Sequence, residues 1–193
     1  NSPAGNLTNL SKIDAGKWVL GGVNTYSGTT TVSNGTLQLL ANAAASTIVN
    51  DLSGITFNQI NQYAGGTLEF VGQNFTNNLE SLGALTPSLG SGTVRLTPGT
   101  GGTASLSFAS LGTVGGGGTV NIVAPSASNT VSFVAVPTSG NIANAGVYYN
   151  GSNFAFIPGA ALAVRAPIYG DGLGGGGSDL DFVTSSSALT AGL

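Results

Sequence analysis

The sequence has no cysteine and no histidine. Without cysteine the chain forms no disulfide, offers no thiol nucleophile and supplies no thiolate to a metal ion. Without histidine it lacks the side chain that most often serves as a general base near neutral pH and as a transition-metal ligand. These two absences exclude the commonest nucleophilic and metal-dependent active sites.

Charge is scarce as well. Only 6% of the 193 residues are charged, with four Lys and Arg against seven Asp and Glu. About a quarter of the residues of an ordinary soluble domain are charged. So few basic residues leave no patch for nucleic acid or anionic lipid, and no apolar run reaches the roughly 18 residues of a spanning helix. We therefore expect neither a nucleic-acid partner nor a membrane span.

Glycine, in contrast, is abundant, with 32 residues, and 41% of the chain is hydrophobic. A glycine in a helix interior costs about 1 kcal/mol relative to alanine, so this composition disfavours helices. Short strands joined by tight turns accommodate glycine well, because it adopts positive φ without steric cost. The composition therefore favours an all-β chain.

A five-residue template, Gly-Thr-(Leu/Val)-polar-apolar, occurs four times. The copies begin at Gly35, Gly66, Gly92 and Gly118, at intervals of 31, 26 and 26 residues. The alternation of apolar and polar residues is that of a strand with one buried face, and recurrence at this spacing is typical of stacked coils. We predict an all-β fold, a right-handed parallel β-solenoid with short strands and Gly-rich turns. A β-sandwich is the alternative, which a repeated template disfavours.

The apolar template positions are predicted to face one continuous core, with the four strands in parallel register. These positions are Leu37, Leu39, Leu68, Phe70, Val94, Leu96, Val120 and Ile122. Trp18 and Leu20 share one face of an earlier strand and are expected to point into the same core. An exposed carbohydrate-stacking platform is the alternative role for Trp18. The polar template positions, Gln38, Glu69, Arg95 and Asn121, are predicted to form a solvated column in which Glu69 neighbours Arg95.

Other short apolar segments, bounded by turn residues, are also predicted to be strands. They comprise residues 17–20, 29–32, 105–108, 130–134, 154–157 and 162–165. One of them contains Thr29, Thr30 and Thr31, which would suit an ice-binding face if the triplet recurred on successive coils. The triplet occurs once, so we do not predict that activity.

Residues 16–37 read Gly-Lys-Trp-Val-Leu-Gly-Gly-Val-Asn-Thr-Tyr-Ser-Gly-Thr-Thr-Thr-Val-Ser-Asn-Gly-Thr-Leu. This segment resembles the autotransporter-associated β-strand repeat of bacterial passenger domains, whose pattern is roughly G-x-W-x-L-x-G-x-N-T-Y-x-G-x-T-x-V-x-x-G-T-L. Residues 149–156 and 164–166 resemble, less closely, the closing parts of long blocks in such proteins. The resemblance implies a parallel β-helix exported to the cell surface, and it carries over no catalytic residue.

The acidic residues were considered as a possible active site or metal site. Asp14, Asp51, Glu69 and Glu80 are scattered singly, whereas the last three acids, Asp171, Asp179 and Asp181, lie in a glycine-rich stretch. That stretch resembles one copy of a calcium-binding Gly-Gly-x-Gly-x-Asp repeat. However, such sites need adjacent copies, and Asp181 stands where an apolar residue is required. We predict a linker at residues 170–193, with these three aspartates as weak calcium candidates and no cofactor.

Neither end of the chain shows a typical cap. Residues 1–10 are mostly polar with no charge, and residues 185–193 are mainly small. An uncapped solenoid presents unpaired strand edges, so we expect both ends to be open. The predicted protein is one non-catalytic, extracellular structural domain over 1–193, with the autotransporter-type repeat at 1–40, that stacks end to end on copies of itself at the bacterial surface. The alternatives are a passenger adhesin, with cell-surface polysaccharide as a candidate partner, and a carbohydrate-active β-helix enzyme.

Overall fold

A computed structural model gives the structure of the chain and describes residues 7–42, 48–49, 53–59, 65–135 and 141–167. Within these ranges the fold is all-β, with parallel sheets and no helix. Accordingly, the described part of the chain contains no helix that is long and apolar enough to cross a membrane.

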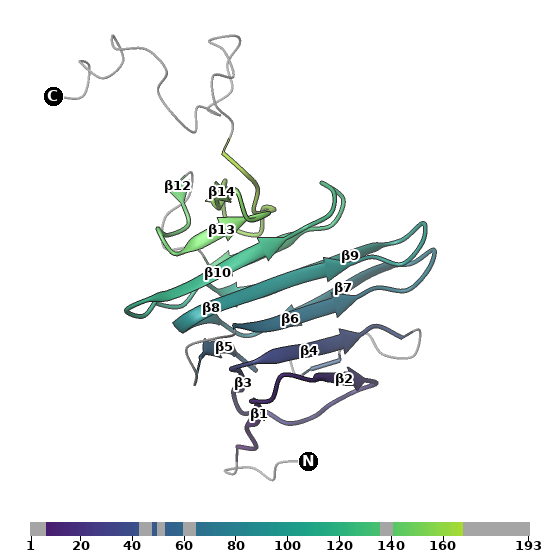
Figure 1. The fold of residues 1–193 in the computed structure, drawn as a ribbon. Coiled ribbons are helices and arrows are strands. Elements are labelled where there is room, and N and C mark those ends of the chain that lie inside the picture. Colours follow the sequence, from purple (N-terminus) through teal and green to yellow (C-terminus); the bar gives the residue numbers. More distant parts are fainter. Residues whose placement is uncertain (1–6, 43–47, 50–52, 60–64, 136–140, 168–193) are drawn as a thin grey trace, which may run out of the picture.

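The parallel strands form three columns (Figure 1). Among the described residues the first strands alternate between the first and second columns, and the third column begins at β7. The first column contains β1 (Leu10–Lys12), β3 (Thr30–Val32), β5 (Ile55–Asn58) and the start of β8 (Leu85–Thr97). The second contains β2 (Lys17–Gly21), β4 (Gly35–Leu40), β6 (Gly66–Val71), the rest of β8, β10 (Gly118–Val123) and β13 (Val147–Tyr149). The third contains β7 (Asn77–Leu82), β9 (Thr103–Ser110) and β11 (Val131–Ala135).

The core lies between the three columns. All eight apolar template positions are at most 3% exposed, and those of β4, β6 and β8 stack in register, Leu37 on Leu68 and Leu68 on Val94. The third column adds Leu82, Leu106, Phe108 and Phe133, and the rings of the last two stack with their centroids 5.8 Å apart. Burying each such side chain contributes about 1.5–3 kcal/mol, so this core is the main source of stability.

The template glycines allow the first and second columns to approach closely. A Cβ atom on Gly66 would lie 2.7 Å from Val32 Cγ1, and one on Gly92 would lie 2.3 Å from Phe57 Cγ. Val32 and Phe57 are themselves cross-strand partners in the first column. Gly66 and Gly92 therefore leave room for first-column side chains of the preceding coil, whereas a Cβ atom on Gly35 or Gly118 would meet backbone atoms instead.

The register of the fourth template strand differs from the prediction by two residues. Ile122 lies opposite Val94, and Val120 lies opposite Gly92, whereas the template predicted Val120 opposite Val94. A shift of two residues leaves every side chain on the same face of the sheet. The hydrophobic pattern therefore determines which face is buried, but it does not distinguish between these two registers.

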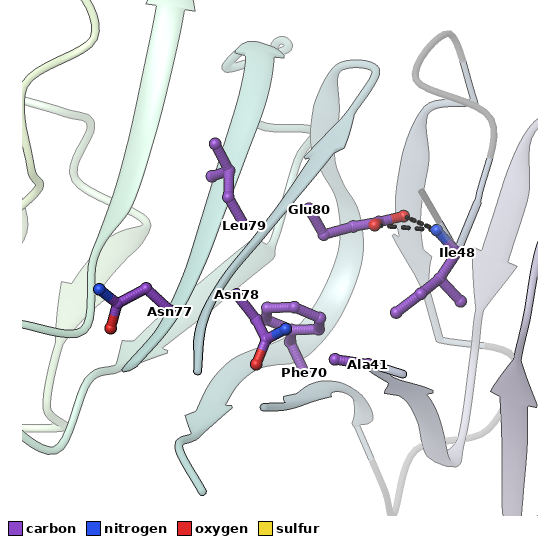
Figure 2. A pocket seen from close by; sticks show the side chains of 7 residues that line it. All are labelled: Ala41, Ile48, Phe70, Asn77, Asn78, Leu79 and Glu80. Atoms are coloured by element: carbon purple, nitrogen blue, oxygen red, sulfur yellow. Dashed lines mark hydrogen bonds between the residues drawn. The ribbon is translucent and has the colours of Figure 1, made fainter. Parts of the chain in front are cut away.

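Glu80, on β7, is buried and joins the third column to the preceding coil (Figure 2). Its carboxylate accepts hydrogen bonds from the backbone N–H of Ile48, at 3.0 and 2.9 Å, and of Val49, at 2.7 Å. Beside it lies a pocket of about 270 Å³ whose lining includes Ala41 and Phe70. A carboxylate that accepts several N–H groups is well satisfied by them, so Glu80 has a structural role here.

Candidate functional site

The first strand of the second column, β2, has an edge that no other described strand covers, called the open edge below. Trp18 lies opposite Leu37 and Leu20 opposite Leu39, so both point to the core side of the sheet. Leu20 is half-buried and packs against the core, whereas Trp18 is 41% exposed. The prediction that Trp18 is a core residue is therefore wrong in this structure. The reason is that, among the described strands, β2 pairs with β4 alone, so no strand covers the other side of Trp18.

The backbone of β2 also presents hydrogen-bonding groups at this edge. The Thr36 N–H donates to the Gly16 carbonyl at 3.1 Å, which places the Gly16 backbone on the side of β4. Successive residues of a strand direct their N–H and C=O groups to opposite sides, so those of Lys17 and Val19 point away from β4. The Val19 side chain is 52% exposed. Within the described residues the edge therefore combines apolar side chains with ladder groups that no strand pairs, which is the composition of a strand-pairing surface.

Lys12 closes the core beneath Trp18. It lies opposite Val32 in the first column and is fully buried. Its ammonium donates to the backbone carbonyls of Asp14 and Asn34, the latter at 3.2 Å, and lies 5.4 Å from the centre of the Trp18 ring. Sequence reasoning missed this residue, because a lone lysine in a short strand is normally solvated.

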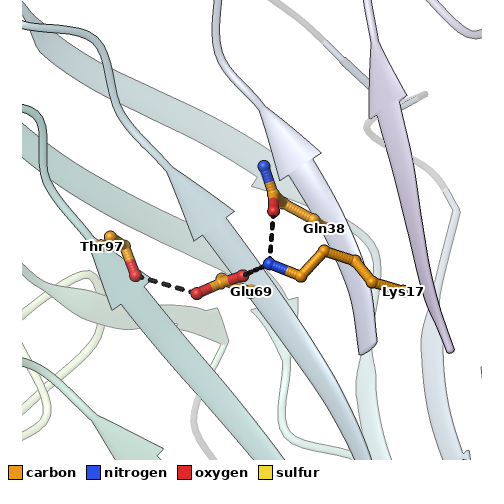
Figure 3. Close-up of polar contacts among 4 residues, drawn as sticks. All are labelled: Lys17, Gln38, Glu69 and Thr97. Atoms are coloured by element: carbon orange, nitrogen blue, oxygen red, sulfur yellow. Dashed lines mark hydrogen bonds and ion pairs between the residues drawn. The ribbon is translucent and has the colours of Figure 1, made fainter. Parts of the chain in front are cut away.

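On the outer face of the second column, a polar network joins β2 to β8 (Figure 3). Lys17 Nζ donates to Gln38 Oε1 at 2.9 Å and forms an ion pair with Glu69 Oε2 at 3.0 Å. Thr97 Oγ1 donates to Glu69 Oε1 at 3.1 Å. The network links residues from four neighbouring strands, so it stabilises the order in which they stack.

This network corrects the predicted polar column in two respects. Glu69 and Arg95 are cross-strand partners as predicted, but the ion pair of Glu69 is with Lys17, and Glu69 is largely buried rather than solvated. Asn121 lies opposite Thr93 instead of Arg95, because of the two-residue shift of β10. Arg95 remains exposed on this face.

Two threonine ladders run along the outside of the stack. The ladder in the first column consists of the successive cross-strand partners Thr31, Thr56 and Thr86. The ladder in the second column consists of Thr36, Thr67 and Thr93. The sequence prediction missed the first ladder, because only Thr31 belongs to a threonine triplet. Each ladder is a single row, and Gln38, Glu69 and Arg95 follow two residues after the second. The ladders therefore act as cross-strand pairs that stabilise the sheet.

The opposite end of the stack is closed within the described residues. β13 turns back at Asn150 and Gly151, both with positive φ, and pairs antiparallel with β14 (Asn153–Phe154). The short strands β12 (Asn141–Ile142) and β15 (Phe156–Ile157) also pair antiparallel. The segment that follows covers β11, where the N–H groups of Ala161 and Val164 donate to the Phe133 and Val131 carbonyls, each at 2.7 Å.

This closure corrects the expectation of an open C-terminal end as far as residue 167, where the described residues stop. An Asn-Gly pair between two apolar runs is a strong signal for a hairpin, and it reverses the chain instead of continuing the parallel ladder. Residues 162–165 form isolated bridges, Ala163 with Ser132 and Arg165 with Phe156, where the sequence predicted a strand. Residues 168–193, including Asp171, Asp179 and Asp181, lie outside the described residues. In the part that the structure describes, no three acidic residues come together as a metal site.

Comparison with known families identifies the segment at the open edge. Residues 10–39, which include β1, β2 and β3 and most of β4, match the family described as passenger-associated-transport-repeat. This match confirms the resemblance found for residues 16–37. The comparisons with curated proteins and with solved structures found no match to the chain.

Proposed function

We propose that this chain is a non-catalytic structural block of a bacterial surface passenger protein, a right-handed β-solenoid whose open edge at β1 and β2 stacks on a further coil. The repeat at residues 10–39 supports the passenger class and, with it, export to the cell surface. The three parallel columns support the solenoid, and right-handed connections are the general rule for parallel strands of one sheet.

One observation carries the stacking proposal. Trp18 stands in register with the buried residues Leu37 and Leu68, but it is half-covered because nothing described lies on its outer side. Another coil on β2 would bury Trp18 and pair the backbone groups of Lys17 and Val19. It would gain both apolar burial and ladder hydrogen bonds, the two contributions that stabilise the rest of the stack.

The two glutamates favour this structural role over the enzyme alternative. Glu80 is buried and accepts hydrogen bonds from backbone amides, and Glu69 is held by Lys17 and Thr97. A glycoside hydrolase needs two carboxyl groups that flank a substrate. Both glutamates are therefore engaged in contacts within the protein, and neither is available as a catalytic acid or base.

The further coil comes either from the same polypeptide or from another copy of the chain. In the second case we propose that copies assemble with one another, as the subunits of a fibre do. The C-terminal closure limits which ends of two copies can pair. The antiparallel β14 offers no continuation of a parallel ladder, so a head-to-tail fibre would require residues 141–167 to rearrange. Two copies can pair through their open edges without any such change; the two-fold axis then makes the two β2 strands antiparallel, and the pairing closes on itself as a dimer.

A proline at the open edge tests stacking. The Val19 N–H points away from β4, so Val19→Pro removes an edge donor and leaves the ladder to β4 in place. We expect the parent chain to associate with rising concentration in sedimentation velocity, and its assemblies to be visible by electron microscopy. Val19→Pro should stay monomeric, and the matched control Val19→Thr, which keeps the donor and the β-branched shape, should associate like the parent. A parent chain that remains monomeric at millimolar concentration would contradict stacking between copies.

A further inference from the structure

The corner between the second and third columns carries an exposed phenylalanine in an unusual backbone conformation. Phe75 is 82% exposed and has a φ of 56°, in the left-handed region that bulky residues rarely adopt. Both features are unfavourable for folding, and a glycine or asparagine would serve this turn better. A residue that is unfavourable in two respects at a surface turn points to a function for its side chain.

The surrounding loops hold the Phe75 ring in place. The ring packs over Gly101, where an added Cβ atom would lie 2.8 Å from the ring atom Cδ1. The Phe75 N–H donates to the Thr100 carbonyl at 2.8 Å, and the Thr100 N–H donates to Asn74 Oδ1 at 2.8 Å. One side of the ring therefore rests on the neighbouring loop, and the rest is presented to solvent as a fixed platform.

An uncharged groove lies beside this platform, on the same corner. It has a volume of about 610 Å³ and is lined by Leu40, Ala41, Asn42, Gly72, Gln73 and Asn74. The lining residues that the structure describes thus combine apolar surface from Leu40 with side-chain amides, and none of them is charged. Amides donate and accept hydrogen bonds, which suits a ligand rich in hydroxyl groups.

From this combination we infer that the corner binds a neutral polysaccharide, with a sugar ring stacked on Phe75 and adjacent sugars in the groove. The C–H face of a pyranose packs on an aromatic ring, and its hydroxyls match the amides of Asn42 and Gln73. The absence of charge in the lining favours a neutral chain over an acidic one. This inference depends on the proposed function only for placing the protein at a surface where such chains occur.

The test is native affinity electrophoresis of the full chain in gels that contain dextran, mannan or xyloglucan, with alginate as the acidic comparison. We expect at least one neutral polysaccharide to retard the parent chain. Phe75→Gly should weaken that binding about tenfold, the loss typical of an aromatic anchor. Phe75→Trp, which keeps an aromatic ring at this position, should bind like the parent. Because glycine suits a positive φ, Phe75→Gly should fold at least as well as the parent.

Ala161→Gly is the matched control, because Ala161 also has a positive φ, of 58°, but lies in the C-terminal closure. It should bind like the parent. The inference is overturned if no neutral polysaccharide retards the parent, if alginate alone does so, or if Phe75→Gly is retarded as strongly as the parent. These outcomes are independent of the Val19→Pro experiment, so a failure here would leave the stacking proposal intact.

Discussion

Trp18 and Leu37 are cross-strand partners on the same face of β2 and β4, yet Leu37 is fully buried and Trp18 is 41% exposed. The two residues have the same orientation relative to the core. They differ in that, among the strands the structure describes, β4 has a neighbour on both sides and β2 on one. The exposure of Trp18 is therefore a property of its position at the end of the stack, and it is the feature that another coil would change.

This relationship predicts unequal costs for two alanine substitutions. Leu37→Ala should lower the free energy of unfolding of the monomer by about 2–5 kcal/mol, because it leaves a cavity between packed strands. Trp18→Ala should cost less than half as much, despite the larger side chain, since much of Trp18 is already in water. Urea unfolding at low protein concentration measures both values. Equal losses would show that Trp18 is covered in solution.

The buried position of Lys12 predicts that removing its ammonium group lowers the free energy of unfolding. Lys12→Met keeps the length of the stem but leaves the Asp14 and Asn34 carbonyls without this donor. We expect a loss of about 1–3 kcal/mol in the free energy of unfolding. Arg95→Met is the matched control, because Arg95 is exposed on the outer face of the second column. Similar losses for the two variants would contradict the buried role of Lys12.

The strand template was the most informative part of the sequence. Its alternation identified the eight core residues by position, because the side chains of a strand alternate between two faces. The template does not distinguish registers that differ by two residues. It therefore predicts Asn121 beside Arg95, whereas Asn121 lies opposite Thr93. The exposure of Trp18 was not predictable either, because it depends on the absence of a neighbouring strand and not on the residue itself.

The candidate site was less predictable than the core. The closure at the C-terminal end had a signal, the Asn150-Gly151 pair, which is typical of a hairpin. Lys12 and Glu80 had none, since each is buried by backbone groups that become neighbours only in the folded chain. Such contacts join residues far apart in sequence, so local patterns do not reveal them.

Glu80 predicts a local effect on two backbone amides. Glu80→Gln replaces one carboxylate oxygen by an NH₂ group, which cannot accept a hydrogen bond from Ile48 or Val49. We expect faster hydrogen exchange at these two amides and a loss of about 1–3 kcal/mol in stability. Glu69→Gln serves as the control, because Glu69 contacts Lys17 and Thr97 and should leave both amides protected. Unchanged exchange in Glu80→Gln would contradict the role assigned to Glu80.

Tyr26 predicts how stability changes at alkaline pH. Burial raises the pKa of Tyr26 above its ordinary value of 10.0, the hydrogen bond with Thr30 lowers it, and the nearby charge of Glu80 raises it further. The net direction is upward, so the folded chain holds this proton at a pH where the unfolded chain has lost it. Stability should therefore fall as the pH rises through about 10 and level off once the folded state also titrates.

Tyr26→Phe removes the titrating group and should reduce this alkaline loss. It also removes the 2.8 Å hydrogen bond between the Tyr26 hydroxyl and Thr30 Oγ1, which should lower stability by about 0.5–1.5 kcal/mol near neutral pH. Burial raises the pKa of Tyr149 as well, so some pH dependence should remain until Tyr149→Phe is added. The free energy of unfolding in urea, measured at a series of pH values from neutral to strongly alkaline, gives these slopes. If Tyr26→Phe loses stability with pH as steeply as the parent, then Tyr26 is not the group whose proton the folded chain retains.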